Sequence, residues 1–327
     1  MHVLKPTATA VVVMLAAVSL AACSSSEPAS VSAKTHAPVD RSNWPEETPA
    51  TGLVKGMELP LEAYMTSYSD QVIIDTALRT LQTQCMAEYG LTVDLPRPGV
   101  NPPLHNNAIS IERRYGITDR TQAEKYGYGL PKELTRSTEP FETGLSAVEV
   151  EVLTGRAKND FLPPGGTKGN GAYLAGGAGK PARTEHQGKR LHEDGCTGWS
   201  KKQIKWDESD TGLITQLAAK SLSDSRSNEP VKKAIKDWSA CMKKQGRSAA
   251  DPYRAMEQGY ASGDGTTEDA IELALDDIDC KQQTRLIKVW FKAESAIQKR
   301  LIEENKDRLV TVKTRMSEVL AAAKAVK

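Results

Sequence analysis

Cys85-Met86-Ala87-Glu88-Tyr89-Gly90 recurs later in the chain as Cys241-Met242-Lys243-Lys244-Gln245-Gly246, and this pair of stretches decides the expected fold. In each stretch the Gly stands where a helix would stop. The pattern therefore predicts two α-helices that each end in Cys-Met-x3-Gly. Apolar residues precede both stretches at helical spacing: Ile74, Leu78 and Leu81 before the first, and Val231, Ala234, Ile235 and Trp238 before the second.

Two further cysteines extend the repeat. Cys196 lies three residues after Glu193 and ten before Trp206, and Cys280 has the same spacing from Asp277 and Trp290. Four cysteines allow three disulfide pairings. The repeat favours Cys85–Cys196 with Cys241–Cys280, one bond in each unit. The sequence has no Cys-x-x-Cys motif, which disfavours a zinc site or a redox pair.

Composition narrows the class of protein. The chain has 327 residues, of which 39% are hydrophobic and 26% charged, so it can build a packed core. The formal net charge of +1 argues against a nucleic-acid partner, which would require a large basic field. The single long apolar run lies at the N-terminus, so a polytopic membrane protein is excluded.

The N-terminus has the layout of a secretory signal peptide, with Lys5 before an apolar stretch from Ala8 to Ala22. Its end, Leu20-Ala21-Ala22-Cys23, resembles the lipobox of bacterial lipoproteins. The resemblance implies that residues 1–22 are removed and that Cys23 carries lipid, palmitate included. The protein would then sit on the extracytoplasmic face of the cell membrane. A plain signal peptide with an incidental cysteine is the alternative.

The chain also resembles actinobacterial secreted lipoproteins of unassigned function, through its Cys-Met-x3-Gly helices followed by Gly195-Cys196 and Asp279-Cys280. This resemblance implies a compartment and a scaffold but no activity. We expect a mainly α fold of disulfide-stapled helical repeat units. The expected parts are a flexible tether (residues 23–52), a first unit (53–206) with a Gly/Pro-rich irregular insertion (91–190), and a second unit (207–327) with a long C-terminal helix (286–320).

Within the insertion, Ser146 and Glu149 fit a capping box that opens a short helix, although Val148, Val150 and Val152 alternate as in a strand. We favour the helix, and we expect residues 163–188 to be mobile. Function concentrates on loops held by a rigid scaffold. The insertion is therefore the expected binding surface. Its candidate residues are Arg113, Arg114, Tyr115, Tyr126 and Tyr128.

Catalytic motifs are missing from the sequence: there is no G-x-S-x-G, no HExxH and no complete P-loop at 171–180. We interpret His186 and His192 with their neighbouring acids as a solvated loop, and Asp276 with Asp279 as helix-dipole acids. We therefore expect no metal, cofactor or catalysis.

The expected function is binding, sensing or scaffolding, with a cell-envelope protein or cell-wall component as partner. The alternative is a cell-wall hydrolase that uses carboxylates near the insertion. A transporter-associated binding protein is disfavoured because few strand patterns are present.

Overall fold

The computed structural model describes residues 38–42, 44–45, 48–102, 111, 113–130, 144–157, 182–207, 209–261 and 263–327. Residues 39–327 form one compact unit. Several predictions fall outside the described residues: the signal peptide, lipidation at Cys23, the tether up to residue 37, and residues 163–181 of the expected mobile segment.

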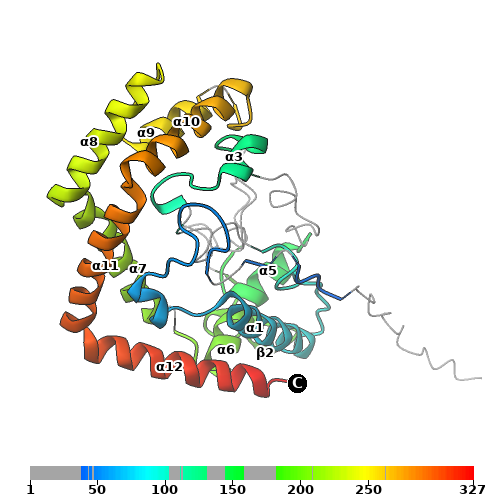
Figure 1. Cartoon of the computed structure of the whole chain (residues 1–327). Helices are drawn as coiled ribbons and strands as arrows, with labels where there is room; N and C mark the ends of the chain where they lie inside the picture. The colour runs from blue at the N-terminus through cyan, green and yellow to red at the C-terminus, as the bar shows by residue number, and fades with distance from the viewer. Residues whose placement is uncertain are drawn as a thin grey trace, which may run out of the picture. The chain divides into compact units, whose positions relative to one another are not determined.

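The described part of the chain is mainly α-helical, as predicted (Figure 1). It contains ten α-helices, one short 3-10 helix and one two-stranded antiparallel sheet. The elements are η1 (Pro60–Tyr64), α1 (Tyr68–Glu88), α3 (Arg120–Tyr126), α5 (Ala147–Thr154), β1 (Glu185–His186), β2 (Lys189–Arg190), α6 (Gly195–Gln203), α7 (Ser209–Arg226), α8 (Glu229–Lys244), α9 (Pro252–Tyr260), α10 (Glu268–Thr284), α11 (Leu286–Glu304) and α12 (Lys306–Ala325).

Both predicted disulfides are present. Cys85–Cys196 joins α1 to α6, and Cys241–Cys280 joins α8 to α10, each with a Cα–Cα distance of 5.6 Å. They close loops of 111 and 39 residues. In the chain-entropy model, loops of these lengths stabilise the fold by about 5 and about 4 kcal/mol. The two bonds therefore join the cysteines that were predicted to pair. The repeat itself is not confirmed, because Cys196 lies at the start of α6 whereas Cys280 lies near the end of α10.

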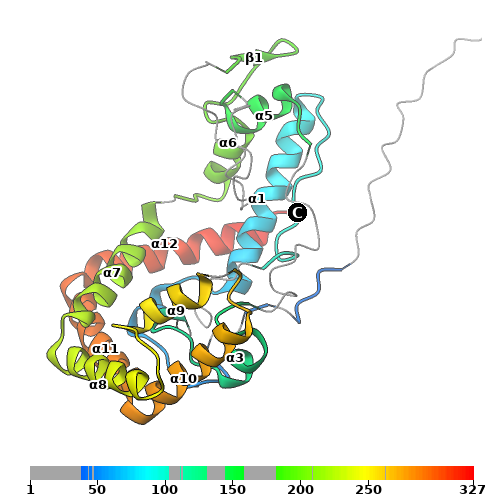
Figure 2. The same cartoon turned by 90° about the horizontal axis from the view of Figure 1, so that it is seen from above.

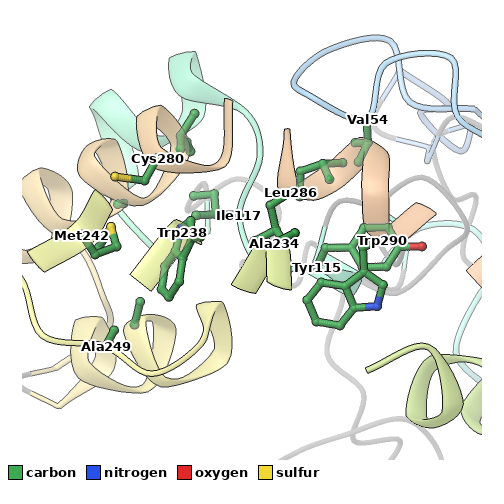
Figure 3. Packing of buried hydrophobic residues seen from close by; sticks show 14 of the residues in the cluster. Val54, Tyr115, Ile117, Ala234, Trp238, Met242, Ala249, Cys280, Leu286 and Trp290 are labelled. Atoms are coloured by element: carbon green, nitrogen blue, oxygen red, sulfur yellow. The ribbon is translucent and has the colours of Figure 1, made fainter. Parts of the chain in front are cut away.

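The largest core cluster joins α8, α9, α10 and α11 to residues of the predicted insertion, among them Tyr115 and Tyr128. Trp238 and Trp290 are fully buried there, and the ring centroid of Tyr115 lies 5.1 Å from that of Trp290 (Figure 3). Helix α3, also from the insertion, packs on α10. The interpretation of residues 91–190 as an irregular insertion is thus wrong for the described residues between 111 and 128, because these residues complete this core.

The C-terminal helix covers the first unit. Figure 1 and Figure 2 both show α12 lying against α1, although the two are far apart in sequence. Ile74, Ala77 and Leu81 of α1 pack there with Val319 and Ala323 of α12. The predicted boundary at residue 206 therefore does not separate two cores.

The helical stretch after Gly265 is broken twice. Arg285 adopts the left-handed conformation, with φ of 54°, and separates α10 from α11. At Asn305 the chain leaves α11 and begins α12, while the Asn305 side chain donates a hydrogen bond to the Leu301 carbonyl. The expected single helix over 286–320 is thus two helices. Packing explains the break at Asn305, because α11 lies on α7 and α8 whereas α12 lies on α1.

The expected tether is also shorter than predicted, because residues 39–52 belong to the compact unit. Trp44 is half-buried; its indole N–H donates to the Gly99 carbonyl at 2.9 Å, and its ring meets Tyr68 edge-on at 5.2 Å. Gly99 is required here, because a Cβ on it would lie 2.8 Å from the indole.

Local sequence signals are confirmed in α5. Ser146 and Glu149 form the reciprocal capping box, and Gly155 ends the helix in the left-handed conformation. The prediction of a helix over this segment is therefore confirmed, and the alternative of a strand is excluded.

Candidate functional site

The residues predicted to form an exposed binding surface lie largely inside the molecule. Tyr115 and Tyr128 are fully buried, and Tyr126 is half-buried at the end of α3. The Arg113 guanidinium donates to the backbone carbonyls of Tyr128 and Gly129, at 2.6 and 2.8 Å. The prediction of a binding surface is therefore wrong for these side chains. Aromatic and cationic groups in a loop-rich sequence were needed to complete the core.

Arg114 enters a buried polar cluster around Glu294 of α11. Its Nε donates to Glu294 Oε1 at 2.9 Å, and its Nη2 contacts the same oxygen. Ser221 of α7 donates to Oε1 at 2.7 Å, and the Tyr115 hydroxyl donates to Oε2 at 2.8 Å. Both carboxylate oxygens are thereby occupied, and the side chain of Glu294 is 0% exposed. No substrate can reach this acid without unfolding the cluster.

A second buried cluster surrounds Asp277 of α10. Lys281 Nζ donates to Asp277 Oδ2 at 2.9 Å and to the Ile117 carbonyl at 2.7 Å. The Tyr128 hydroxyl and the Trp238 indole N–H each donate to the carboxylate at 3.0 Å. Burial raises the pKa of Asp277, and the ion pair with Lys281 opposes that rise.

The ammonium of Lys281 needs a glycine beside it. A Cβ on Gly116 would lie 2.7 Å from Lys281 Nζ, so a side chain at this position would displace the ammonium. Both side chains of the Asp277–Lys281 pair are 0% exposed. The two clusters are closed, fully bonded networks that fix how the helices meet the segment 113–128.

A different acid is open to solvent. Glu62 in η1 is half-buried, and burial raises its pKa to about 7, with the neighbouring Glu58 adding to the rise and Arg114 opposing it. Glu62 could therefore exchange a proton near neutral pH. Among the described residues, the other acids with a raised pKa are Asp75 of α1 and the fully buried Asp277 of α10.

A groove of about 370 Å³ runs between α1, the end of α12 and the residues Arg41 and Trp44. Its charged lining residues are Arg41 and Lys324, and none of the acids that the structure describes lines it. The Arg41 guanidinium lies over the Trp44 ring, 5.0 Å from its centroid. The apolar part of the lining consists of Val72, Ile73, Ala77, Ala323 and Val326. Hydroxyl groups come from Ser69, Thr76 and Thr80.

The histidines of the hairpin region do not form a metal site. His192 stacks on Trp199 with ring centroids 5.8 Å apart and meets Tyr89 edge-on, so it serves packing. Across the described ranges, no group of three or more His, Cys, Asp or Glu side chains is placed to hold a metal ion. In the same part of the chain, no helix is long and apolar enough to cross a membrane.

Comparison of the chain with protein-family models, with curated proteins and with solved structures found no match.

Sequence reasoning missed the partners that hold these networks. Glu294 and Gln298 follow Leu286 and Trp290 at intervals of four residues, so they lie on the apolar face of α11, and that spacing was the available signal. Asp277 and Lys281 also stand four residues apart, as helical ion pairs do. No comparable signal marked the groove, whose walls are separated by more than 240 residues.

Neighbouring acids of α10 allow a matched test of the Asp277 cluster. Asp277→Asn should lower the free energy of unfolding by about 3–5 kcal/mol, because Lys281 would keep a buried charge without its counter-ion. Asp276→Asn should cost about 1 kcal/mol or less, because Asp276 pairs with Arg247 at a partly solvated position. Urea unfolding of both variants measures the difference. Equal costs would contradict the assignment.

Glu62 should make stability depend on pH. Its pKa is higher in the folded than in the unfolded chain, so folding loses stability as pH rises from about 4.5 to 7 and stays lower above that. Glu62→Gln should therefore stabilise the protein more at pH 8 than at pH 5, by about 1–2 kcal/mol after allowance for partial solvation. Glu318→Gln is the control, because Glu318 is exposed on α12 and is not among the groups that shift the pKa of Glu62. A pH-independent difference for Glu62→Gln would show that this carboxyl titrates normally.

Proposed function

We propose that this protein is a lipid-anchored binding module on the extracytoplasmic face of the cell membrane, with a cell-envelope component as its ligand and no catalytic chemistry of its own. Two features support the compartment. The segment Leu20-Ala21-Ala22-Cys23 resembles a lipobox, and the folded part contains two disulfides, which persist in oxidising compartments.

One observation carries the choice of binding over catalysis: the most deeply buried acids are inaccessible, while no acid that the structure describes lines the groove. The carboxylate oxygens of Glu294 and Asp277 accept hydrogen bonds from other groups inside the protein. Catalysis by acids and bases needs titratable groups that converge on an accessible cleft. The groove instead offers an aromatic wall, apolar side chains and two cations. That arrangement suits retention of a ligand.

A cell-envelope hydrolase is the second candidate, and Glu62 is the observation that favours it. A carboxyl with pKa near 7 can act as a general acid at neutral pH. Glycoside cleavage, however, requires a second carboxyl group that faces the same bond. The nearby Glu294 does not meet this requirement, because it is fully buried.

The anchor is tested by Cys23→Ala. The unmodified chain should incorporate labelled palmitate and fractionate with membranes, because two or more acyl chains anchor a protein stably. The variant should incorporate no label and should either remain unprocessed or appear in the medium. Normal processing together with membrane retention of Cys23→Ala would contradict lipid attachment at this residue.

Binding and hydrolysis are separated by thermal unfolding with fractionated envelope extract. A fraction that contains the ligand should raise the Tm of the unmodified protein, and Thr76→Trp, which fills the groove from an exposed position on α1, should abolish the rise. Glu62→Gln should leave the rise intact. The hydrolase alternative makes the opposite prediction: chemical change in the extract that depends on Glu62 and not on Thr76.

A further inference from the structure

We propose that the groove between α1, the end of α12 and the residues Arg41 and Trp44 binds an anionic amphiphile with a single acyl chain, of the fatty-acid class. Its chain would lie along the apolar lining and its anionic head would meet Arg41 and Lys324. This inference rests on the proposed function, because it names the ligand of the same groove.

Charge complementarity points to an anion. Arg41 and Lys324 are the charged residues that line the groove, and no carboxylate of the described residues lines it with them. Both are exposed, and neither forms an ion pair with another described residue. An anionic head group placed here would therefore meet two cationic side chains without displacing a salt bridge between described residues. A cationic head group would be repelled by both of these side chains.

The apolar lining points to an acyl chain. The half-buried Ile73 and Val326 present the accessible part of this lining, and the buried Val72, Ala77 and Ala323 lie beneath them at the junction of α1 and α12. Each methylene removed from water contributes about 0.8 kcal/mol, so even a partly covered chain adds useful affinity. The volume of about 370 Å³ is near the lower end of ligand pockets, which span about 300–1,000 Å³. One chain fits this size better than a two-chain phospholipid.

The position of the groove in the chain favours a lipid over a peptide. Its rim residue Arg41 lies 18 residues after Cys23, because 41 − 23 = 18. A chain of that length spans at most about 60 Å. With Cys23 in the membrane, the groove is held within that distance of the bilayer, where single-chain lipids are released and exchanged. The proposed anchor would thus keep the groove close to its ligand.

The test uses residues 24–327, which contain the whole compact unit and lack the competing anchor. Isothermal titration calorimetry with laurate, below its critical micelle concentration, should give saturable one-to-one binding. Three probes separate head from chain: dodecyltrimethylammonium reverses the head charge, dodecyl maltoside removes it, and butyrate shortens the chain. Each of these probes should bind at least about tenfold more weakly than laurate.

Variants locate the site. Arg41→Glu and Lys324→Glu should each weaken laurate binding about tenfold or more, and Thr76→Trp should abolish it. Arg308→Glu, a cation exchange on α12 away from the groove, is the matched control and should change nothing. Circular dichroism and non-reducing peptide mapping confirm that each variant is folded with both disulfides.

Three results would decide against the proposed ligand. Equal binding of laurate and dodecyltrimethylammonium, or binding that survives Thr76→Trp, would overturn the inference. Absence of laurate binding would also overturn it. The proposed function would survive that result if another envelope fraction still raised the Tm in a Thr76-dependent way. If Thr76→Trp changed neither laurate binding nor the rise in Tm with any envelope fraction, both the inference and the proposed function would be contradicted.

Discussion

The ion pair between Arg114 and Glu294 is the interaction on which the assembly of this protein depends. Around it meet the segment 113–116, α7 through Ser221, and α11 itself. Gln298, one turn further along α11, donates to Ser221 and accepts from the backbone N–H of Leu61 in η1. Segments from the middle and last thirds of the chain are therefore tied to one carboxylate, and η1 joins them through Gln298.

Buried charge of this kind fixes geometry more than it adds stability. Taking two ions out of water costs several kcal/mol for each ion, and their attraction recovers this only when hydrogen bonds satisfy the remaining atoms. Both the Glu294 and the Asp277 clusters meet that condition. Residues 114–115 and α7 donate to Glu294, and Tyr128, Trp238 of α8 and Lys281 of α10 donate to Asp277. An apolar core could be equally stable, but it would tolerate other registers of the helices.

The same rigidity positions the groove. Helix α12 reaches α1 only because the chain turns at Asn305, after α11 has been fixed on α7 and α8. The opposite rim depends on Trp44, whose indole is held by the Gly99 carbonyl and the edge of Tyr68. Both sides of the groove are thus held in place by packed residues. The two cations at its rim, Arg41 and Lys324, are themselves exposed.

The sequence by itself determined the local features: the helix that ends at Gly90, the helix that ends at Gly246, the capping box at Ser146 and the choice of disulfide partners. Each depends on residues within a few positions or on a repeated spacing, so each is encoded in neighbouring side chains. Only the tertiary structure decided that Tyr115 and Tyr128 are core residues and that α12 lies on α1. A tyrosine beside an arginine has the same local pattern in a core as on a surface. A tyrosine can be buried when an acid from a distant segment accepts the hydrogen bond of its hydroxyl, as Glu294 does for Tyr115 and Asp277 does for Tyr128.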